Sequence, residues 1–357
     1  MRALRSRTGF LLALGVLAAA LPVSLAVAAS FGTNALPVDQ VYTVIRWELG
    51  RLLGQTIPAQ WAPGTAVHDV VWLIRLPRLV LAAAVGVCLS LCGVAMQAVV
   101  QNPLADPYIL GISSGASLGA TLAVLLGVGA ALGQNAVGVM AFLGALAVSC
   151  AVVFLANLGG RASPVKLLLA GSALSAVCGA FSNFVVYQTG PDQAASQVMR
   201  WTMGSLAAAS WPVNGVMLGI ALLGTVFFLS QSRGLNLMLL GDETARTLGV
   251  DLHRRRLACL AAAALMTGFA VWAAGIIGFV GLVVPHVVRM LFGTDHRRLV
   301  PLSALTGGLF LLWADVLCRV ILPGSELPVG ILTSMLGAPV FLWLMARGRY
   351  HFGGGAA

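Results

Sequence analysis

The chain has 357 residues, of which 59% are hydrophobic and only 9% are charged. Soluble domains carry roughly a quarter charged residues, so the composition excludes an ordinary soluble protein and indicates a polytopic membrane protein in a lipid bilayer. The formal net charge of +10 does not indicate a nucleic-acid partner, because the basic residues lie at the ends of apolar runs and form no long basic tract with interleaved aromatic residues.

Apolar runs of membrane-spanning length recur along the whole chain. A spanning helix needs about 20 apolar residues, and such runs lie at 9–29, 72–97, 112–132, 136–157, 165–186, 212–230, 256–274, 276–292, 300–318 and 328–346. They are continuous rather than alternating, which favours helices over a β-barrel. We predict an all-α fold with about ten transmembrane helices in a single domain, 1–357.

The first run also resembles a signal peptide, with a basic start and an AxA-like end. Signal cores span roughly 7–15 residues, and this run is longer, so we expect a retained first helix. Most Lys and Arg residues fall on the side that holds both termini. The positive-inside rule therefore predicts that both termini are cytoplasmic, with the polar segment 30–71 on the outer side.

Residues 232–256 form a charged stretch between two spans, with eight Asp, Glu and Arg residues and several leucines. Gly241 is typical of a left-handed helix stop, and Asp242 can cap a following helix. We therefore predict two short helices, 235–240 and 243–248, the second stopped by Gly249. Because one side is apolar, we interpret the stretch as a docking element rather than a solvated loop.

The chemistry of an energy source or an enzyme is missing from this sequence. A P-loop requires a lysine in GxxxxGK[ST], and the only lysine, Lys166, lies in ASPVKLL. Asp315 is the one good candidate for a buried carboxylate of an ion-coupled carrier. The six cysteines show no metal or disulfide spacing. We expect a non-enzymatic permeation subunit driven by another subunit; a secondary carrier or a passive channel stays open.

Three arginines lie at outer helix ends, against the general charge bias: Arg75, Arg78 and Arg319. Together they suggest a receptor surface for an acidic partner. Two GxxxG steps at Gly111, Gly115 and Gly119 favour close helix packing within the chain. Segments 78–93 and 256–275 share an Arg-Leu start and an Ala-rich body, which suggests an inverted repeat.

Seven sequence blocks, in order, resemble the FecCD-type permeases, the membrane subunits of ABC importers for ferric siderophores, haem and cobalamin. The blocks are RLPR (75–78), QNPLADPYILGISSGASLG (101–119), LLLAGSAL (167–174), WTMGSL (201–206), GDETARTLGV (241–250), GFVGLVVPHVVRMLFGTDHRRLVP (278–301) and ELPVGILTSMLGAPVFLWL (326–344). The resemblance implies the cobalamin-importer permease fold in a bacterial inner membrane. It also implies a homodimer, two cytoplasmic ATPase subunits that hold ATP-Mg, and a periplasmic binding protein. No cofactor or metal is expected on this chain itself.

The resemblance also implies roles for particular residues. ATPase coupling falls to Asp242, Glu243, Thr244, Arg246, Leu248 and Gly249. The docking of the binding protein falls to Arg75, Arg78 and Arg319, which would meet its glutamates. The fifth helix would line the path, with candidates Leu168, Ser172, Ser175, Gly179, Ser182 and Asn183, and Arg200 near the outer mouth. A cytoplasmic gate would use Asn102, Leu104, Ser163 and Pro164.

The substrate is the least constrained part of this reading. None of the five histidines lies on the fifth helix, so we expect the metal to stay inside its chelate or macrocycle. Arg200 could meet an anionic group such as a haem propionate, although an interface role explains it as well. We order the candidates as haem or ferric siderophore first and cobalamin second.

Overall fold

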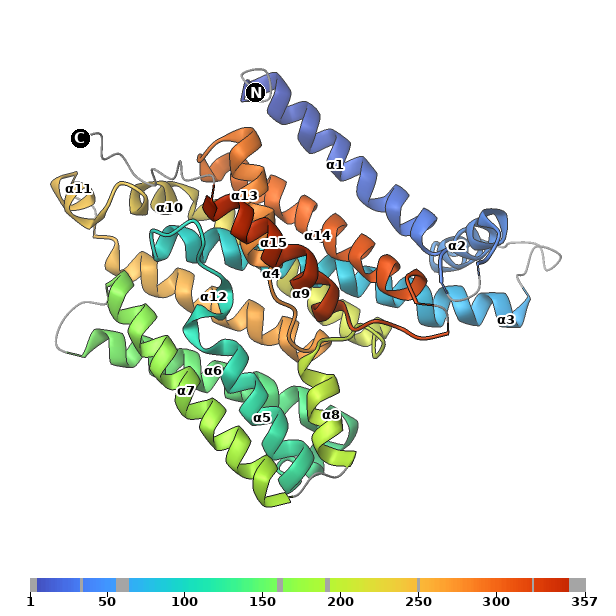
Figure 1. Cartoon of the computed structure of the whole chain (residues 1–357). Coiled ribbons are helices and arrows are strands. Elements are labelled where there is room, and N and C mark those ends of the chain that lie inside the picture. Colours follow the sequence, from blue (N-terminus) through green and yellow to red (C-terminus); the bar gives the residue numbers. More distant parts are fainter. Residues whose placement is uncertain are drawn as a thin grey trace.

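The computed structural model describes residues 5–32, 35–55, 64–158, 163–189, 193–248, 251–322 and 324–346, and these ranges contain helices and loops but no strand (Figure 1). Ten helices correspond to the ten predicted spans: α1 (Arg7–Ala28), α4 (Leu76–Val99), α5 (Ile112–Leu126), α6 (Ala136–Asn157), α7 (Pro164–Thr189), α9 (Trp211–Ser230), α12 (His253–Ala274), α13 (Val280–Phe292), α14 (His296–Val320) and α15 (Val329–Ala346). Seven of the described helices are long and apolar enough to cross a membrane alone, while α5, α13 and α15 are shorter apolar helices.

Short helices connect and cover these spans. They are α2 (Val38–Leu52), α3 (Thr65–His68), the π-helix η2 (Asp69–Arg75), the 3-10 helices η3 (Pro107–Leu110) and η4 (Ala130–Asn135), α8 (Gln193–Thr202), α10 (Ser232–Met238) and α11 (Asp242–Thr247). The π-helix runs directly into α4, so the first outer arginine closes the π-helix and the second lies in the first turn of α4. Such π segments are rare and are frequent at functional sites.

Helix α4 is the centre of the larger group of helices. Almost all of its residues are buried, and it packs against α9, α12, α13 and α14. The backbones of α4 and α14 approach closely, because a side-chain carbon on Gly86 would lie 2.2 Å from the Gly307 carbonyl oxygen. Helices α4 and α12 lie side by side and run in opposite directions (Figure 1), as the proposed repeat requires; the repeat itself stays a prediction.

Helices α5, α6 and α7 form a second group, which α12 joins to the first by packing against both α4 and α6 (Figure 1). The predicted glycine steps pack inside the chain. A side-chain carbon on Gly115 would lie 2.4 Å from the Gly144 oxygen, and one on Gly119 would lie 2.1 Å from the Met140 oxygen. These glycines therefore let α5 and α6 touch backbone to backbone.

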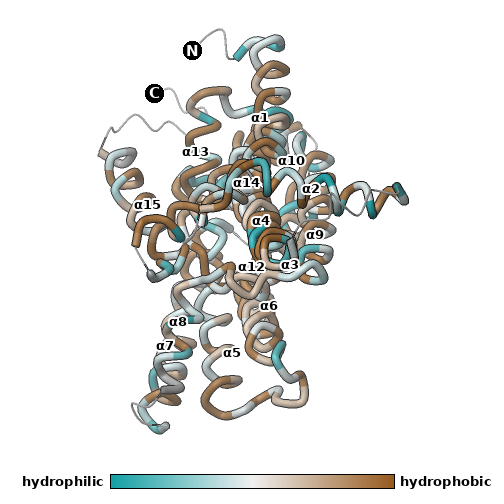
Figure 2. Tube along the Cα trace, turned by 90° about the vertical axis from the view of Figure 1, so that its right-hand side faces the viewer, coloured by the Kyte–Doolittle hydropathy of each residue, from teal (hydrophilic) through white to brown (hydrophobic). Residues whose placement is uncertain are grey.

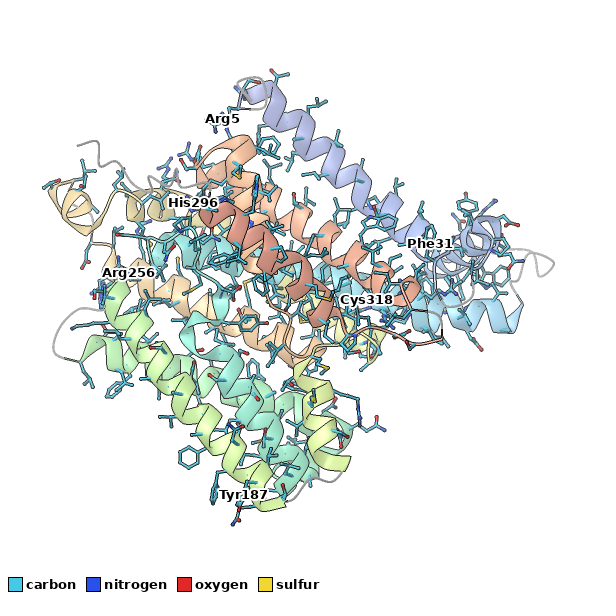
Figure 3. The ribbon with its side chains drawn as sticks, viewed as in Figure 1. Arg5, Phe31, Tyr187, Arg256, His296 and Cys318 are labelled. Atoms are coloured by element: carbon cyan, nitrogen blue, oxygen red, sulfur yellow. The ribbon has the colours of Figure 1, made fainter. Side chains whose placement is uncertain are left out.

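The bundle has two distinct ends. Helices α10 and α11 lie at one end of the bundle, and α2 and α3 lie at the other (Figure 1). Arg5, Arg256 and His296 are found toward the α10–α11 end, and Phe31 toward the α2–α3 end (Figure 3). Between the ends, α1 and α15 are mostly hydrophobic (Figure 2). Several of their large apolar side chains are exposed, among them Leu12 and Met335, as expected of surfaces that face lipid.

Some predicted boundaries were wrong. The span expected at 276–292 begins as a helix only at Val280, because residues 275–279 are non-helical and Phe279 has a φ of 67°. The first short helix of the charged stretch is α10, which begins three residues before the predicted start and ends at Met238. The second is α11, close to the predicted 243–248, and Gly241 separates them with a φ of 89°.

Candidate functional site

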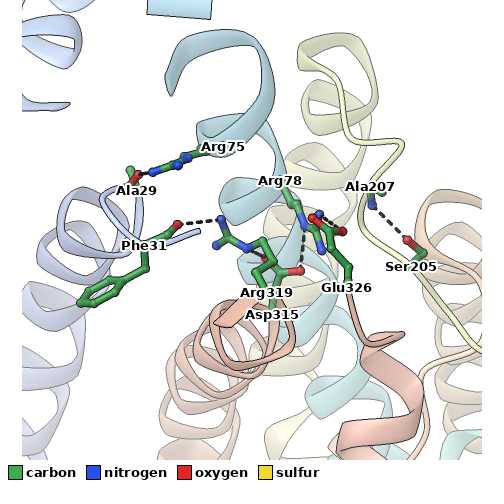
Figure 4. A network of polar contacts seen from close by, with 9 residues as sticks. All are labelled: Ala29, Phe31, Arg75, Arg78, Ser205, Ala207, Asp315, Arg319 and Glu326. Atoms are coloured by element: carbon green, nitrogen blue, oxygen red, sulfur yellow. Dashed lines mark hydrogen bonds and ion pairs between the residues drawn. The ribbon is translucent and has the colours of Figure 1, made fainter. Parts of the chain in front are cut away.

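The three outer arginines lie together at the α2–α3 end (Figure 4). Arg75 and Arg78 come from the η2–α4 junction, and Arg319 comes from the last turn of α14. All three are buried, with at most 7% of each residue exposed. The predicted cluster is therefore present as a buried group rather than as an open surface, and its role in docking stays a prediction.

Asp315 holds two of these arginines. Its Oδ1 accepts a hydrogen bond from Nε of Arg78 at 2.8 Å, and its Oδ2 lies 3.1 Å from Nε of Arg319. The Asp315 side chain is fully buried. Asp315 and Arg319 are one helical turn apart on α14, the spacing at which opposite charges meet on one face. Asp315 is therefore the internal counter-ion of the cluster.

Glu326 is the second carboxylate of the cluster, and its surroundings differ from those of Asp315. Its Oε2 accepts a hydrogen bond from Nη1 of Arg78 at 2.7 Å, while 43% of its side chain is exposed. It lies in the non-helical segment between α14 and α15. Arg78 thus uses two edges of its guanidinium fork for two carboxylates, one buried and one at the surface.

Backbone carbonyls from the end of α1 complete the cluster. Nη1 of Arg75 donates to the carbonyl oxygens of Ala29 at 2.8 Å and Ser30 at 3.1 Å, and Nη1 of Arg319 donates to that of Phe31 at 3.1 Å (Figure 4). The buried Nη2 of Arg319 has no hydrogen-bond partner in the described part of the chain. Three guanidiniums against two carboxylates leave one positive charge in excess, so the cluster can accept another anion.

A cavity of about 370 Å³ opens beside this cluster. Its polar lining is Arg75, Arg78, Arg319 and Glu326, and its apolar lining includes Val67 and Ile74. Guanidinium groups beside an apolar wall suit a carboxylate carried on an aliphatic stem, such as a glutamate side chain. The geometry therefore fits recognition of an acidic side chain.

Helices α10 and α11 form the second candidate site, at the opposite end. Leu235 and Met238 of α10 are fully buried, whereas Leu240, between the two helices, is 50% exposed and Leu248, directly after α11, is 59% exposed. Thr244 is also exposed. Of the other predicted coupling residues, the side chains of Asp242, Glu243 and Arg246, and all of Gly249, lie outside what the structure describes. One side of the element is anchored in the bundle, and the other presents leucines to the outside.

Asn236 anchors α10 to the start of α14. Its Nδ2 donates to Oδ1 of Asp295 at 2.8 Å, and its Oδ1 accepts from the backbone N–H of His296 at 2.9 Å. The same Oδ1 lies 2.7 Å from Nδ1 of His296. Asp295 is the N-cap of α14. Burial raises the pKa of its carboxyl, but the bonds from Asn236 and the Arg297 N–H outweigh this effect and hold the pKa below its usual value. The carboxylate is therefore ionised at neutral pH.

Gln101 provides a second anchor. Its Nε2 donates to the carbonyl oxygen of Met238 at 2.9 Å, which ties the end of α10 to the loop that follows α4. Gln101 has a φ of 54°, an uncommon conformation for a residue other than glycine. That loop carries the predicted gate residues Asn102 and Leu104, and Oδ1 of Asn102 accepts from the Leu104 N–H at 2.9 Å.

The other half of the predicted gate lies at the start of α7. Oγ of Ser163 accepts from the Lys166 N–H at 3.4 Å, and Pro164 is the first residue of the helix. Within the described ranges no hydrogen bond joins Asn102 or Leu104 to this turn, so the structure does not connect the two halves directly. The gate stays a prediction.

The predicted path residues follow one stripe along α7, at the border between its packed and its exposed sides. Ser182 is buried and Oγ of Ser175 accepts from Oγ of Ser114 of α5 at 3.0 Å, so both face the neighbouring helices. Ser172 and Asn183 are exposed, while Leu168 and Gly179 are half-buried. Arg200 is exposed on α8. The exposed face of α7 also carries Phe181 and Tyr187, which are 59% and 83% exposed.

Sequence reasoning missed Glu326, Asn236 and Gln101. Glu326 and Gln101 had a usable signal, because each opens one of the blocks that carry the resemblance. Asn236 and Gln101 find partners 60 and 137 positions away in the chain, and no local pattern predicts these contacts. Asp315 was considered for an ion relay, but both of its oxygens face arginines.

Comparisons with known proteins agree with this architecture. The FecCD transport family matches residues 12–347. The ABC transporter permease protein YvrB of Bacillus subtilis is 41% identical over 336 residues, covering 94% of this chain and 92% of the relative. The hemin transport system permease HmuU of Yersinia pestis is 44% identical over 293 residues, covering 80% and 86%.

Two further matches extend the comparison. The cobalamin import system permease BtuC of Halobacterium salinarum is 40% identical over 326 residues, covering 91% of this chain and 85% of the relative. A solved structure described as a metal-chelate type ABC transporter in an inward-facing conformation superposes with a TM-score of 0.78. It is 27% identical and covers 94% of this chain and 98% of its own.

Proposed function

The chain belongs to the FecCD transport family, and from this premise we propose that it is the membrane subunit of an ATP-driven importer for an iron chelate or haem. Its energy comes from a separate ATPase subunit, since the sequence contains no P-loop lysine. The observation that carries the proposal is α10–α11, an element anchored in the bundle on one side and with exposed leucines on the other. The exposed side is the ATPase contact.

Movement of α10 is passed on by its two anchors. Asn236 bonds α10 to the residue that precedes α14, and Gln101 bonds the end of α10 to the loop that carries Asn102 and Leu104. One displacement of α10 therefore reaches both a long transmembrane helix and the predicted gate. Because α14 carries Asp315 and Arg319 near its other end, the same helix links the two candidate sites.

The substrate path lies between two copies of the chain. The side of α7 that carries Ser172 and Asn183 is exposed in one copy, as far as the chain is described, and a homodimer would place two such sides opposite each other across the path. Serine, asparagine and small residues provide contacts without a strong binding site, which suits release of a bulky chelate. The names of the hemin and cobalamin relatives support a metal macrocycle, with cobalamin as the second candidate.

The α2–α3 end faces the periplasm in this proposal, and the arginine cluster receives glutamates of a substrate-binding protein. Asp315 is held by two arginines, which weighs against an ion-coupled carrier that needs a free carboxylate. The test is copurification: an ATPase subunit should purify with the wild-type chain and should be lost when the α10–α11 surface is altered. Substrate uptake into vesicles that lack ATP and any ATPase subunit would contradict the proposal.

A further inference from the structure

The two carboxylates of the arginine cluster differ in a way that separates a permanent partner from an exchangeable one. Asp315 is fully buried and contacts both Arg78 and Arg319. Removing a partner of that kind leaves buried charge without compensation. Glu326 is 43% exposed, and its described contact is the single hydrogen bond to Arg78. An exposed pair of this kind adds little stability and breaks easily.

From this difference we propose that Glu326 is a placeholder carboxylate, which occupies Arg78 in the free permease and leaves when an acidic side chain of the docking partner enters the cavity. The inference rests on the proposed function, because it takes the partner to be the substrate-binding protein. The exchange replaces one carboxylate on Arg78 with another. Arg78 therefore keeps two carboxylate partners in the free state and in the complex, of which Asp315 is the permanent one.

The lining of the cavity indicates that an entering carboxylate replaces Glu326 on Arg78 rather than binding beside it. Glu326 itself lines the cavity, together with Arg75, Arg78 and Arg319, so an entering carboxylate meets Glu326 at the same edge of Arg78. Arg75 and Arg319 line the same cavity, and the described hydrogen bond of Glu326 goes to Arg78 alone. The incoming carboxylate thus enters a cavity with two guanidinium groups that Glu326 does not bond.

The position of Glu326 gives the exchange a structural consequence. Only Leu327 and Pro328 separate it from α15, and the Leu327 N–H is bonded to the Cys318 carbonyl oxygen of α14 at 3.1 Å. Two hydrogen bonds therefore hold the segment between α14 and α15: the bond of Glu326 to Arg78 and the bond of Leu327 to Cys318. When Glu326 leaves Arg78, the segment loses the first of these bonds, and docking is transmitted to the start of α15.

The test compares E326Q with wild type for binding of the importer's periplasmic substrate-binding protein to the permease in nanodiscs. When Glu326 competes for Arg78, the apparent affinity for the binding protein equals the intrinsic affinity multiplied by the fraction of molecules in which Glu326 has left Arg78. If Arg78 is free in about a tenth of them, E326Q should bind about tenfold more tightly. D39N is the matched control, because Asp39 is exposed on α2 at the same end and carries the same charge. It should change affinity less than about twofold.

E326D retains the charge and should stay close to wild type. A second measurement uses wild type alone: hydrogen exchange at 324–327 should become faster when the binding protein docks. An E326Q affinity equal to that of D39N, or exchange at 324–327 that slows on docking, would overturn the placeholder role. If wild type binds no substrate-binding protein at all, the proposed function fails instead, so the two failures can be told apart.

Discussion

The side-chain amide of Asn236 lies 2.8 Å from Oδ1 of Asp295, which bonds helix α10 to the cap of helix α14. Asp295 also accepts from the Arg297 N–H at 3.1 Å, so a single carboxylate caps α14 and holds α10. One side chain of α10 therefore bonds the proposed ATPase contact to the first turn of α14, whose last turn carries Arg319.

Replacing Asn236 with alanine should uncouple hydrolysis from transport. The variant removes the bonds to Asp295 and His296 but leaves the exposed leucines of α10–α11 in place. ATPase binding and ATP hydrolysis should therefore persist, while uptake per ATP falls roughly two- to thirtyfold, the range of coupling energies between sites. Ser230→Ala is the control, because the Ser230 hydroxyl is exposed and donates to its own helix at Phe227. Equal loss of hydrolysis and uptake in N236A would contradict the assignment.

Placing a charge on the exposed side of α11 should weaken the ATPase contact. Leu248 is 59% exposed, and burying a leucine at an interface contributes about 1.5–3 kcal/mol. Leu248→Asp should therefore reduce ATPase copurification about tenfold or more. Leu12→Asn is a control, because Leu12 is a similarly exposed leucine on a different helix, α1. Undiminished copurification of L248D would show that the ATPase binds elsewhere.

The two carboxylates of the arginine cluster should differ sharply in their effect on stability. Asp315→Asn leaves Arg78 and Arg319 buried without their shared counter-ion and should lower the free energy of unfolding by about 3–5 kcal/mol. Glu326→Gln should change it by less than about 1 kcal/mol, because water screens the exposed side of that pair. Chemical unfolding of the purified variants in detergent measures both. Similar losses in the two variants would mean that Glu326 is as structural as Asp315.

Asp106 should give the protein a pH-dependent stability. It lies in the loop after α4 and caps η3 through the Tyr108 N–H at 2.9 Å. Burial raises its pKa from 3.8 to about 6, and backbone bonds from Tyr108 and Phe279 offset only part of this effect. The folded protein therefore prefers the protonated carboxyl, and this contribution, present below pH 3.8, is lost as the pH rises through about 6.

Asp106→Asn keeps an oxygen that can accept from Tyr108 and removes the titration. Between pH 4 and pH 7 the wild type should lose up to about 3 kcal/mol of stability relative to this variant. Unfolding midpoints of the two proteins across that range measure the difference. Parallel curves would show that Asp106 keeps its ordinary pKa.

The number and order of the spans could be predicted because each is a continuous apolar run, a signal that does not depend on the rest of the chain. Gly241 likewise marked the break between α10 and α11 through a local backbone requirement. The start of α13 could not be found in this way, since residues 275–279 are as apolar as the helix that follows. Composition alone does not show where a backbone leaves the helical conformation.

The candidate sites were predictable in part. The three arginines were singled out by charge, but their burial depends on Asp315 and Glu326, which lie 237 and 248 positions from Arg78. Only the turn-spaced pair of Asp315 and Arg319 is visible in the local sequence. The path residues of α7 were chosen by residue type, and which of them are buried depends on where α5 and α6 pack.

Uptake by proteoliposomes containing the chain and its ATPase subunit tests the central claim most directly. Haem, a ferric siderophore and cobalamin are each supplied on the outside with the binding protein, and ATP is supplied inside or withheld. The account predicts accumulation of one of them only when both ATP and the ATPase subunit are present. Accumulation without ATP that collapses on addition of a protonophore would contradict it and identify an ion-coupled carrier.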